Sequence, residues 1–144
     1  MKNILTTIDF SYNEKLVMDM AVNMAKAFDG KIWLLHVVPP EPEFIGFGVG
    51  PQYVRDSRAA ELRKERRLMN EYAEQMQEKG VDAQGLVIEG ATVDMILDKA
   101  EKLDIDLIIT GHHEHNFVYK AFFGSVAKGV VKKTKIPVLL VPLE

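Results

Sequence analysis

The hydrophobic positions of the chain follow two alternating patterns. Short, nearly continuous apolar runs rich in β-branched residues are typical of buried strands, whereas apolar residues repeated every three or four positions are typical of amphipathic helices. The runs predict strands over 3–8, 31–38, 82–89, 106–110 and 137–142. Helical patterns fill the intervals, including a long, highly charged one over 54–79. This alternation predicts an α/β protein with a doubly wound parallel sheet and helices on both faces.

Local signals predict where the helices begin and end. Ser11 and Glu14 have the spacing of a capping box, which would start the first helix, and Gly30 would end it. The last helix would follow Ser125. Its predicted apolar face consists of Val126, Ala127, Val130 and Val131.

Ligands of doubly wound sheets bind at the carboxyl ends of the strands, where the strand order reverses. Asp9 follows the first strand, and Val37 lies near the end of the second. The segment 39–53 then combines four prolines with three glycines and predicts a long mobile loop. This loop would cover a site, present a surface to a partner, or fold its apolar residues back onto its own domain.

The segment 111–124, after the fourth strand, is a candidate phosphate loop. We expect Gly111 to open a polar turn, and Gly124 and Ser125 to lead into the last helix. Free backbone N–H groups and a serine hydroxyl at a helix start suit an anion, and phosphate above all. Serine is also a common N-cap, and the two roles of Ser125 are compatible.

Four stretches together resemble the universal stress protein (UspA-like) family. They are Asp9-Phe10-Ser11, LLHVV at 34–38, GATVDMILDKAEKLDIDLIITG at 90–111 and FGSVAKGVVKKTKIPVLLVP at 123–142. The resemblance covers the whole chain and implies a single domain over 1–144. With it, we expect five strands in the order 3-2-1-4-5, in a Rossmann-like fold of the adenine nucleotide alpha hydrolase type.

Members of this family that bind ATP share the pattern G-x2-G-x9-G-[S/T]. Gly111, Gly124 and Ser125 match it, but Glu114 stands at the second glycine. The resemblance implies that the residue after the first strand and a backbone group of the second hold the adenine, while the phosphates lie along the glycine loop. The nucleotide-binding residues expected on this basis are Asp9, Val37, Gly111, His113, Glu114, Gly124, Ser125 and Val126.

Glu114 bears on how tightly phosphates would be held. A left-handed backbone at this residue would cost roughly 1–2 kcal/mol. A carboxylate about 4 Å from a phosphate would add repulsion of about 1 kcal/mol in water and more in a drier site. The side chain could instead point outward. We favour retained binding of AMP, ADP or ATP, and Mg²⁺ could bridge the glutamate and the phosphates.

His112, His113 and His115 form a second candidate site. Imidazoles are transition-metal ligands, but adjacent residues rarely all turn toward one ion, and the spacing is not that of a zinc helix. Metal binding is therefore the weaker alternative to hydrogen bonding with phosphate or ribose, or to exposure to solvent. His36 lies on a buried strand, and we expect it to be a core histidine whose hydrogen bonds are satisfied.

Composition narrows the classes of function. A chain of 144 residues is long enough for one domain with its own core. A net charge of -3 gives no basic field for nucleic acid, and no apolar run approaches the length of a membrane span. The absence of cysteine excludes thiol chemistry and disulfides. Without an export signal, we expect a cytoplasmic protein.

Three functions stay open. The favoured one is an adenine-nucleotide-binding regulatory module in the stress response, which passes its state to an unknown protein partner. The alternative is a dimeric interaction protein that binds no nucleotide. A slow or metal-assisted ATP hydrolase is the weakest, because the sequence has no nucleophile–base pair and no Walker lysine. The resemblance also implies a homodimer through the last strand, Pro137–Pro142; otherwise the terminal prolines would protect the edge of a monomer.

Overall fold

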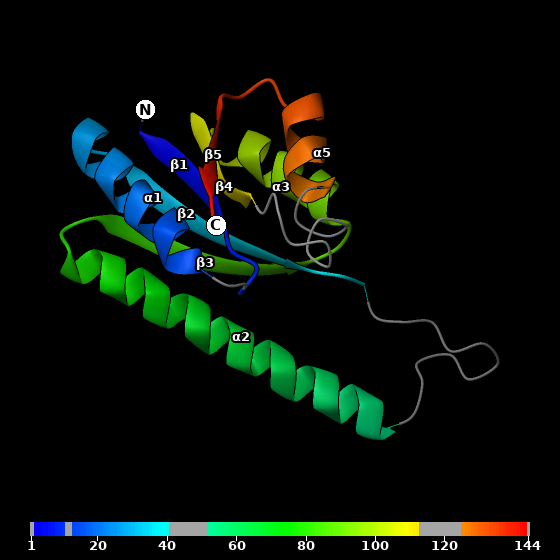
Figure 1. Cartoon of the computed structure of the whole chain (residues 1–144). Helices are drawn as coiled ribbons and strands as arrows, with labels where there is room; N and C mark the ends of the chain where they lie inside the picture. The colour runs from blue at the N-terminus through cyan, green and yellow to red at the C-terminus, as the bar shows by residue number, and fades with distance from the viewer. Residues whose placement is uncertain (1, 11–12, 41–51, 113–124, 144) are drawn as a thin grey trace.

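The computed structural model describes residues 2–10, 13–40, 52–112 and 125–143. Strands and helices alternate along this part of the chain (Figure 1). They are β1 (Asn3–Thr7), α1 (Glu14–Phe28), β2 (Lys31–Val38), α2 (Gln52–Glu78), β3 (Asp82–Glu89), α3 (Thr92–Lys102), β4 (Leu107–His112), α5 (Ser125–Lys133) and β5 (Val138–Pro142). The strands form one parallel sheet in the order β3-β2-β1-β4-β5, which confirms the predicted fold class and strand order.

Helices cover both faces of the sheet. α1 and α2 lie on one face, and α3 and α5 lie on the other (Figure 1). Successive strand residues point to opposite faces. In β1, Ile4 belongs to the buried cluster under α1 and α2, and Leu5 belongs to the cluster under α3 and α5. A sheet covered on both sides therefore needs continuous apolar strands, as the sequence has.

The carboxyl edge of the sheet is uneven. The last pair between β1 and β2 joins Thr7 to Leu35, whereas β2 continues to Val38 alongside β3. On the other side, β4 continues to His112 alongside β5. The central strand thus ends before its neighbours, at the point where the strand order reverses, and a pocket opens there.

The end of β4 differs from the prediction. The strand was expected to stop at Thr110 and to give way to a polar turn at Gly111. Instead, Gly111 pairs with Val141 and His112 pairs with Pro142. Because β5 offers partners along its whole length, β4 continues through the first two residues of the candidate phosphate loop.

The start of α1 also differs. The N-cap is Asn13, in a left-handed conformation with a φ of 62°, so Glu14 is the first helical residue and not the third one that a serine N-cap at position 11 would make it. Ser11 lies outside the described residues. The Glu14 carboxylate instead accepts hydrogen bonds from the backbone N–H groups of Asp9 (3.0 Å) and Phe10 (2.8 Å). Glu14 therefore fixes the turn that follows β1.

Two further helix predictions need correction. At the end of α1, Asp29 and not Gly30 adopts the left-handed conformation, with a φ of 52°. In α5, Ala127 and Val130 are buried as predicted, but Val131 is 49% exposed. The buried face of α5 is thus narrower than the sequence suggests.

The long helix α2 is close to its predicted span of 54–79. Its buried side chains, Met69, Ala73 and Met76, all lie in its C-terminal half. Among the described residues, no helix is long and apolar enough to cross a membrane.

Candidate functional site

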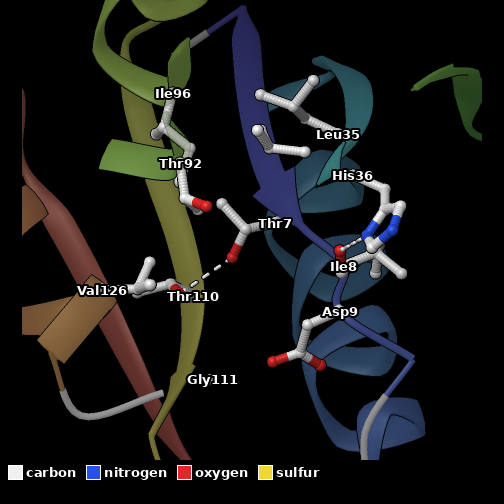
Figure 2. Close-up of a pocket in the computed structure, with 11 residues that line it drawn as sticks. Thr7, Ile8, Asp9, Leu35, His36, Thr92, Ile96, Thr110, Gly111 and Val126 are labelled. Atoms are coloured by element: carbon white, nitrogen blue, oxygen red, sulfur yellow. Dashed lines mark hydrogen bonds between the residues drawn. The ribbon is translucent and has the colours of Figure 1, made fainter. Parts of the chain in front are cut away.

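The pocket lies at the carboxyl ends of β1, β2 and β4 and is closed by the first turns of α3 and α5 (Figure 2). Its volume is about 180 Å³. The residues that line it are Thr7, Ile8, Asp9, Leu35, His36, Val37, Thr92, Ile96, Thr110, Gly111 and Val126. Apolar side chains form most of the walls, and a few polar groups converge on the interior, as is usual for a small-molecule site.

A pair of hydroxyl groups forms part of the pocket. Thr7 Oγ1 and Thr110 Oγ1 lie 2.8 Å apart and share a hydrogen bond across β1 and β4 (Figure 2). Two hydroxyls carry two donors and four lone pairs, and their mutual bond uses one of each. The pair therefore keeps one donor and several acceptor positions for a ligand. Thr92, at the start of α3, adds a third hydroxyl to the lining.

The peptide groups of Val37 face the side of β1. In a parallel strand, the backbone groups of successive residues point alternately to the two neighbouring strands. The Val38 carbonyl accepts from Gly90 N toward β3 (3.0 Å), and the Leu35 carbonyl accepts from Ile8 N toward β1 (2.8 Å). The peptide groups of Val37 thus point toward β1, but the pairing of β1 with β2 has already ended at Leu35. An amide donor and a carbonyl acceptor lie next to each other there, on a residue that lines the pocket.

His36 forms another part of the wall. Its Nδ1 lies 2.7 Å from the carbonyl oxygen of Ile8 (Figure 2), and its Nε2 lies 3.4 Å from Glu65 Oε2 on α2. The ring also packs against Phe10, with 4.6 Å between ring centroids. Nδ1 of His36 therefore has the hydrogen-bond partner expected of a core histidine, whereas Nε2 faces a carboxylate oxygen that has no hydrogen-bond partner among the described residues.

Charge in the pocket is concentrated on Asp9. Among the described lining residues, no lysine or arginine is present. Behind the same turn, burial raises the pKa of Glu14 above its ordinary value of 4.5, against the hydrogen bonds from Phe10 and Asp9, which lower it. The pocket thus suits an uncharged part of a ligand that carries hydrogen-bond donors. An anionic part would fit better toward the N-terminus of α5.

Gly111 contributes backbone to the pocket, but packing on the opposite face explains why it has no side chain. A Cβ atom at this position would lie 2.6 Å from Leu143 Cδ1 and 3.2 Å from Val17 Cγ2. Both neighbours belong to the cluster under α1 and α2. The φ of Gly111 is not positive, so no turn requires this glycine.

The structure brings four of the expected nucleotide-binding residues to one pocket: Asp9, Val37, Gly111 and Val126. Ser125 begins α5 next to them, but its side chain is not among those described. His113, Glu114 and Gly124 lie outside the described residues, as does most of the 39–53 loop.

Comparison with known proteins agrees with this architecture. A profile described as the universal stress protein family matches residues 1–142. The chain belongs to the universal stress protein family. It is 31% identical to universal stress protein MJ0531 of Methanocaldococcus jannaschii, over 84% of this chain and 70% of that protein. It is 26% identical to the stress response protein NhaX of Bacillus subtilis, over 96% of each chain.

Solved structures of other proteins, among them universal stress proteins, share the fold. The hypothetical protein MJ0577 superposes with a TM-score of 0.82 at 22% identity, and the alignment covers 99% of this chain and 96% of that one. A universal stress protein in complex with cAMP has a TM-score of 0.70 at 19% identity, over 99% and 98% of the two chains. The protein from Archaeoglobus fulgidus in complex with dAMP has a TM-score of 0.65 at 18% identity, over 98% of each chain. At these identities the similarity establishes the fold alone.

The histidine cluster of this family member is only partly described. His112 is the last residue of β4, whereas His113 and His115 fall in the stretch that the structure does not describe. Metal binding by this cluster therefore stays an untested alternative.

Sequence reasoning missed seven of the eleven lining residues, and three of these are the threonines Thr7, Thr92 and Thr110. A signal was available for two of the threonines, because Thr7 ends β1 and Thr92 begins α3 on the ligand-binding edge of the sheet, whereas Thr110 lies inside β4. Threonine is also a common strand residue, so the sequence alone does not separate a pocket hydroxyl from an ordinary strand position.

Proposed function

We propose that this universal stress protein is a cytoplasmic regulatory module that binds AMP, ADP or ATP in the pocket at the end of β1. The observation that carries the proposal is the convergence of Asp9, Val37, Gly111 and Val126 on that pocket. The complexes of two structural relatives with cAMP and with dAMP support the choice of an adenine nucleotide.

The chemistry of the pocket suits a nucleoside. Adenine presents a ring nitrogen acceptor beside an amino donor, and the adjacent N–H and C=O groups of Val37 would complement that edge. The apolar side chains of Leu35 and Ile96 would flank the ring. Asp9 is an acceptor, which suits ribose hydroxyls or an amino group.

The phosphates would leave the pocket toward α5. Val126, in the first turn of this helix, lines the pocket, so the free N–H groups of the helix start lie at its edge. With ADP or ATP, Mg²⁺ would be held mainly by phosphate oxygens, since it favours such ligands.

The first test is the nucleotide content of the purified protein. Heat-denatured protein should release an adenine nucleotide that is identified by its mass. Added AMP at about 100 times its Kd should stabilise the fold by roughly 2.7 kcal/mol. The absence of both released nucleotide and stabilisation by millimolar AMP, ADP or ATP would refute the proposal.

Asp9→Asn provides a residue-level test. We expect it to weaken AMP binding by at least about tenfold, because a charged hydrogen bond is worth roughly 1.5–3 kcal/mol. The matched control is Asp82→Asn, an exposed carboxylate at the opposite end of the sheet. Equal affinities of the two variants would exclude Asp9 from the site.

We also propose that the chain forms a homodimer through β5, and that an unidentified protein partner reads the nucleotide state. β5 is an edge strand with one neighbour, β4, among the described strands. Its central residue, Leu140, is 41% exposed. An exposed edge strand that carries an apolar side chain favours pairing with another strand.

A further inference from the structure

The imidazole of His36 connects helix α2 to the wall of the pocket. On one side, its Nδ1 lies 2.7 Å from the carbonyl oxygen of Ile8, the residue before Asp9. On the other side, its Nε2 lies 3.4 Å from Glu65 Oε2. The two side chains are largely enclosed, with exposures of 12% for His36 and 19% for Glu65. A displacement of α2 would therefore reach the turn that carries Asp9.

The geometry fixes where protons must be. A carbonyl oxygen only accepts, so Nδ1 of His36 must carry a proton to bond with Ile8. A neutral imidazole would then direct the lone pair of Nε2 at the Glu65 carboxylate, and two acceptors would face each other. Glu65 Oε2 is enclosed and has no aligned hydrogen-bond donor among the described residues. The link is therefore favourable only when one further proton resides between His36 and Glu65.

Three groups of the pocket depend on this link. The Ile8 carbonyl is held by His36, and the next residue, Asp9, points into the pocket (Figure 2). Val37 follows His36 directly in β2, so its peptide groups move with the histidine. Histidine is the side chain that ordinarily changes its charge between pH 5 and 8.

We propose that His36 and Glu65 are positioning residues of the nucleotide pocket, and that the proton they share makes AMP binding weaken as pH rises. This inference rests on the proposed function. When the proton leaves, the carboxylate and Nε2 repel each other, α2 separates from the wall, and the groups that would hold the nucleoside lose their alignment. α2 thereby gains a means of reporting or controlling the state of the pocket.

Other ionisable groups face this link and must be separated from it. They are Asp9 in the turn, Glu14 on α1, Arg58, Glu61 and Tyr72 on α2, and Glu89 on β3. Arg58 donates to the Pro39 carbonyl (2.7 Å) and lies 3.7 Å from Glu89. The phosphate of AMP also titrates near neutral pH. A pH profile of the wild type alone would combine all these effects.

The Glu65→Gln variant isolates the pair. The side-chain amide of glutamine can donate to the lone pair of a neutral His36, so the link persists without the extra proton. We would measure the Kd of AMP by calorimetry from about pH 5.5 to about pH 8.5 and take the ratio of wild type to Glu65→Gln at each pH. All other titrations cancel in this ratio. It should rise by about tenfold from the lowest to the highest pH.

Two further variants complete the test. His36→Asn retains a donor near the position of Nδ1 but has no group in the place of Nε2 to pair with Glu65, so the link to α2 is lost at every pH. Its AMP affinity should be weaker than that of Glu65→Gln, and the ratio of these two affinities should not change with pH. Glu74→Gln removes a carboxylate from an exposed position of the same helix and should follow the wild type. A constant ratio of wild type to Glu65→Gln, or a folded Glu65→Gln protein that fails to bind AMP while the wild type binds, would overturn the inference but not the proposed function. A lack of AMP binding by every protein at every pH would overturn both.

Discussion

Two different reasons can explain why residue 111 is a glycine. Its place in the motif suggests a glycine needed by phosphate, whereas the structure shows a glycine needed by Leu143 and Val17 on the other face of β4. The sequence could not reveal this, because the contacting side chain of Leu143 follows a full helix and strand later. Gly111 still lines the pocket, so its predicted contact with a nucleotide stays a prediction beside the packing role that the structure shows.

We expect Gly111→Ala to destabilise the fold by about 1–3 kcal/mol, the usual cost of overpacking a core. The reason is the 2.6 Å approach of the added Cβ atom to Leu143 Cδ1. Urea unfolding would measure the change. In a Leu143→Ala background the same substitution should cost much less, since the clashing atom is gone. Equal costs in the two backgrounds would contradict the packing explanation.

Glu14 should make stability depend on pH. Its folded-state pKa is raised above 4.5 by burial, so the folded chain binds this proton more tightly than the unfolded chain. The resulting stabilisation is complete below pH 4.5 and is lost as pH rises through the folded-state pKa. Relative to Glu14→Gln, the wild type should therefore lose stability across that window, as measured by urea unfolding from about pH 4 to about pH 7.

Asp106 provides a control, because its contribution to stability should depend on pH in the opposite direction to that of Glu14. Its carboxylate accepts from the backbone N–H groups of Asn3 (3.0 Å) and Lys2 (2.9 Å), and these bonds hold its pKa below 3.8. Its contribution is present above pH 3.8 and is lost as pH falls further. Asp106→Asn should thus be less stable than the wild type above pH 3.8, and this difference should disappear as pH falls further. A Glu14→Gln profile parallel to the wild type would refute the role assigned to Glu14.

At the scale of elements, the sequence predicted which helices and strands exist more accurately than the residues at which they begin and end. All five strands and the helices between them were expected, because short continuous apolar runs differ clearly from apolar residues repeated about every 3.6 positions. The ends of β4 and the start of α1 were missed for a common reason. Both are set by contacts with distant parts of the chain: β5 extends β4, and the turn after β1 recruits Glu14.

The two halves of α2 should differ in what they contribute to stability. Met69, in the C-terminal half, is 1% exposed, and α2 approaches β3 closely because Gly85 leaves room for the Met69 backbone. We expect Met69→Ala to cost about 2–5 kcal/mol in urea unfolding. Leu62→Ala, at a partly exposed position in the N-terminal half, should cost roughly 1 kcal/mol.

Comparable losses for the two substitutions would show that α2 is anchored along its whole length. The expected difference would leave the N-terminal half of α2 held less tightly than the C-terminal half, and the contact of Glu65 with His36 lies at the middle of the helix, between the two halves. A helix attached in this way can respond to a change in the pocket at little cost to the fold.

At the scale of the whole molecule, the sheet topology determines where a ligand and a partner can bind. The reversal of strand order between β1 and β4 creates the pocket, and this feature could be predicted from the alternation of strands and helices. The same order leaves β5 at an edge, away from the pocket wall formed by β2. Which hydroxyls complete the pocket could not be predicted, because it depends on register: Thr7 and Thr110 meet only when β1 and β4 are aligned as observed.

The dimer proposed through β5 gives a prediction at this scale. Antiparallel pairing of two copies about a two-fold axis at the middle of Val138–Pro142 places Leu140 opposite the same residue of the second copy. Leu140→Lys would then oppose two like charges across a strand pair, which is destabilising. We expect sedimentation equilibrium to give twice the chain mass of 16.3 kDa for the wild type and the single mass for the variant.

The control is Leu16→Lys, which changes a similarly exposed leucine on α1 and should remain dimeric. A monomeric wild type would show instead that Pro137 and Pro142 protect this edge, because proline has no N–H group to offer a neighbouring strand.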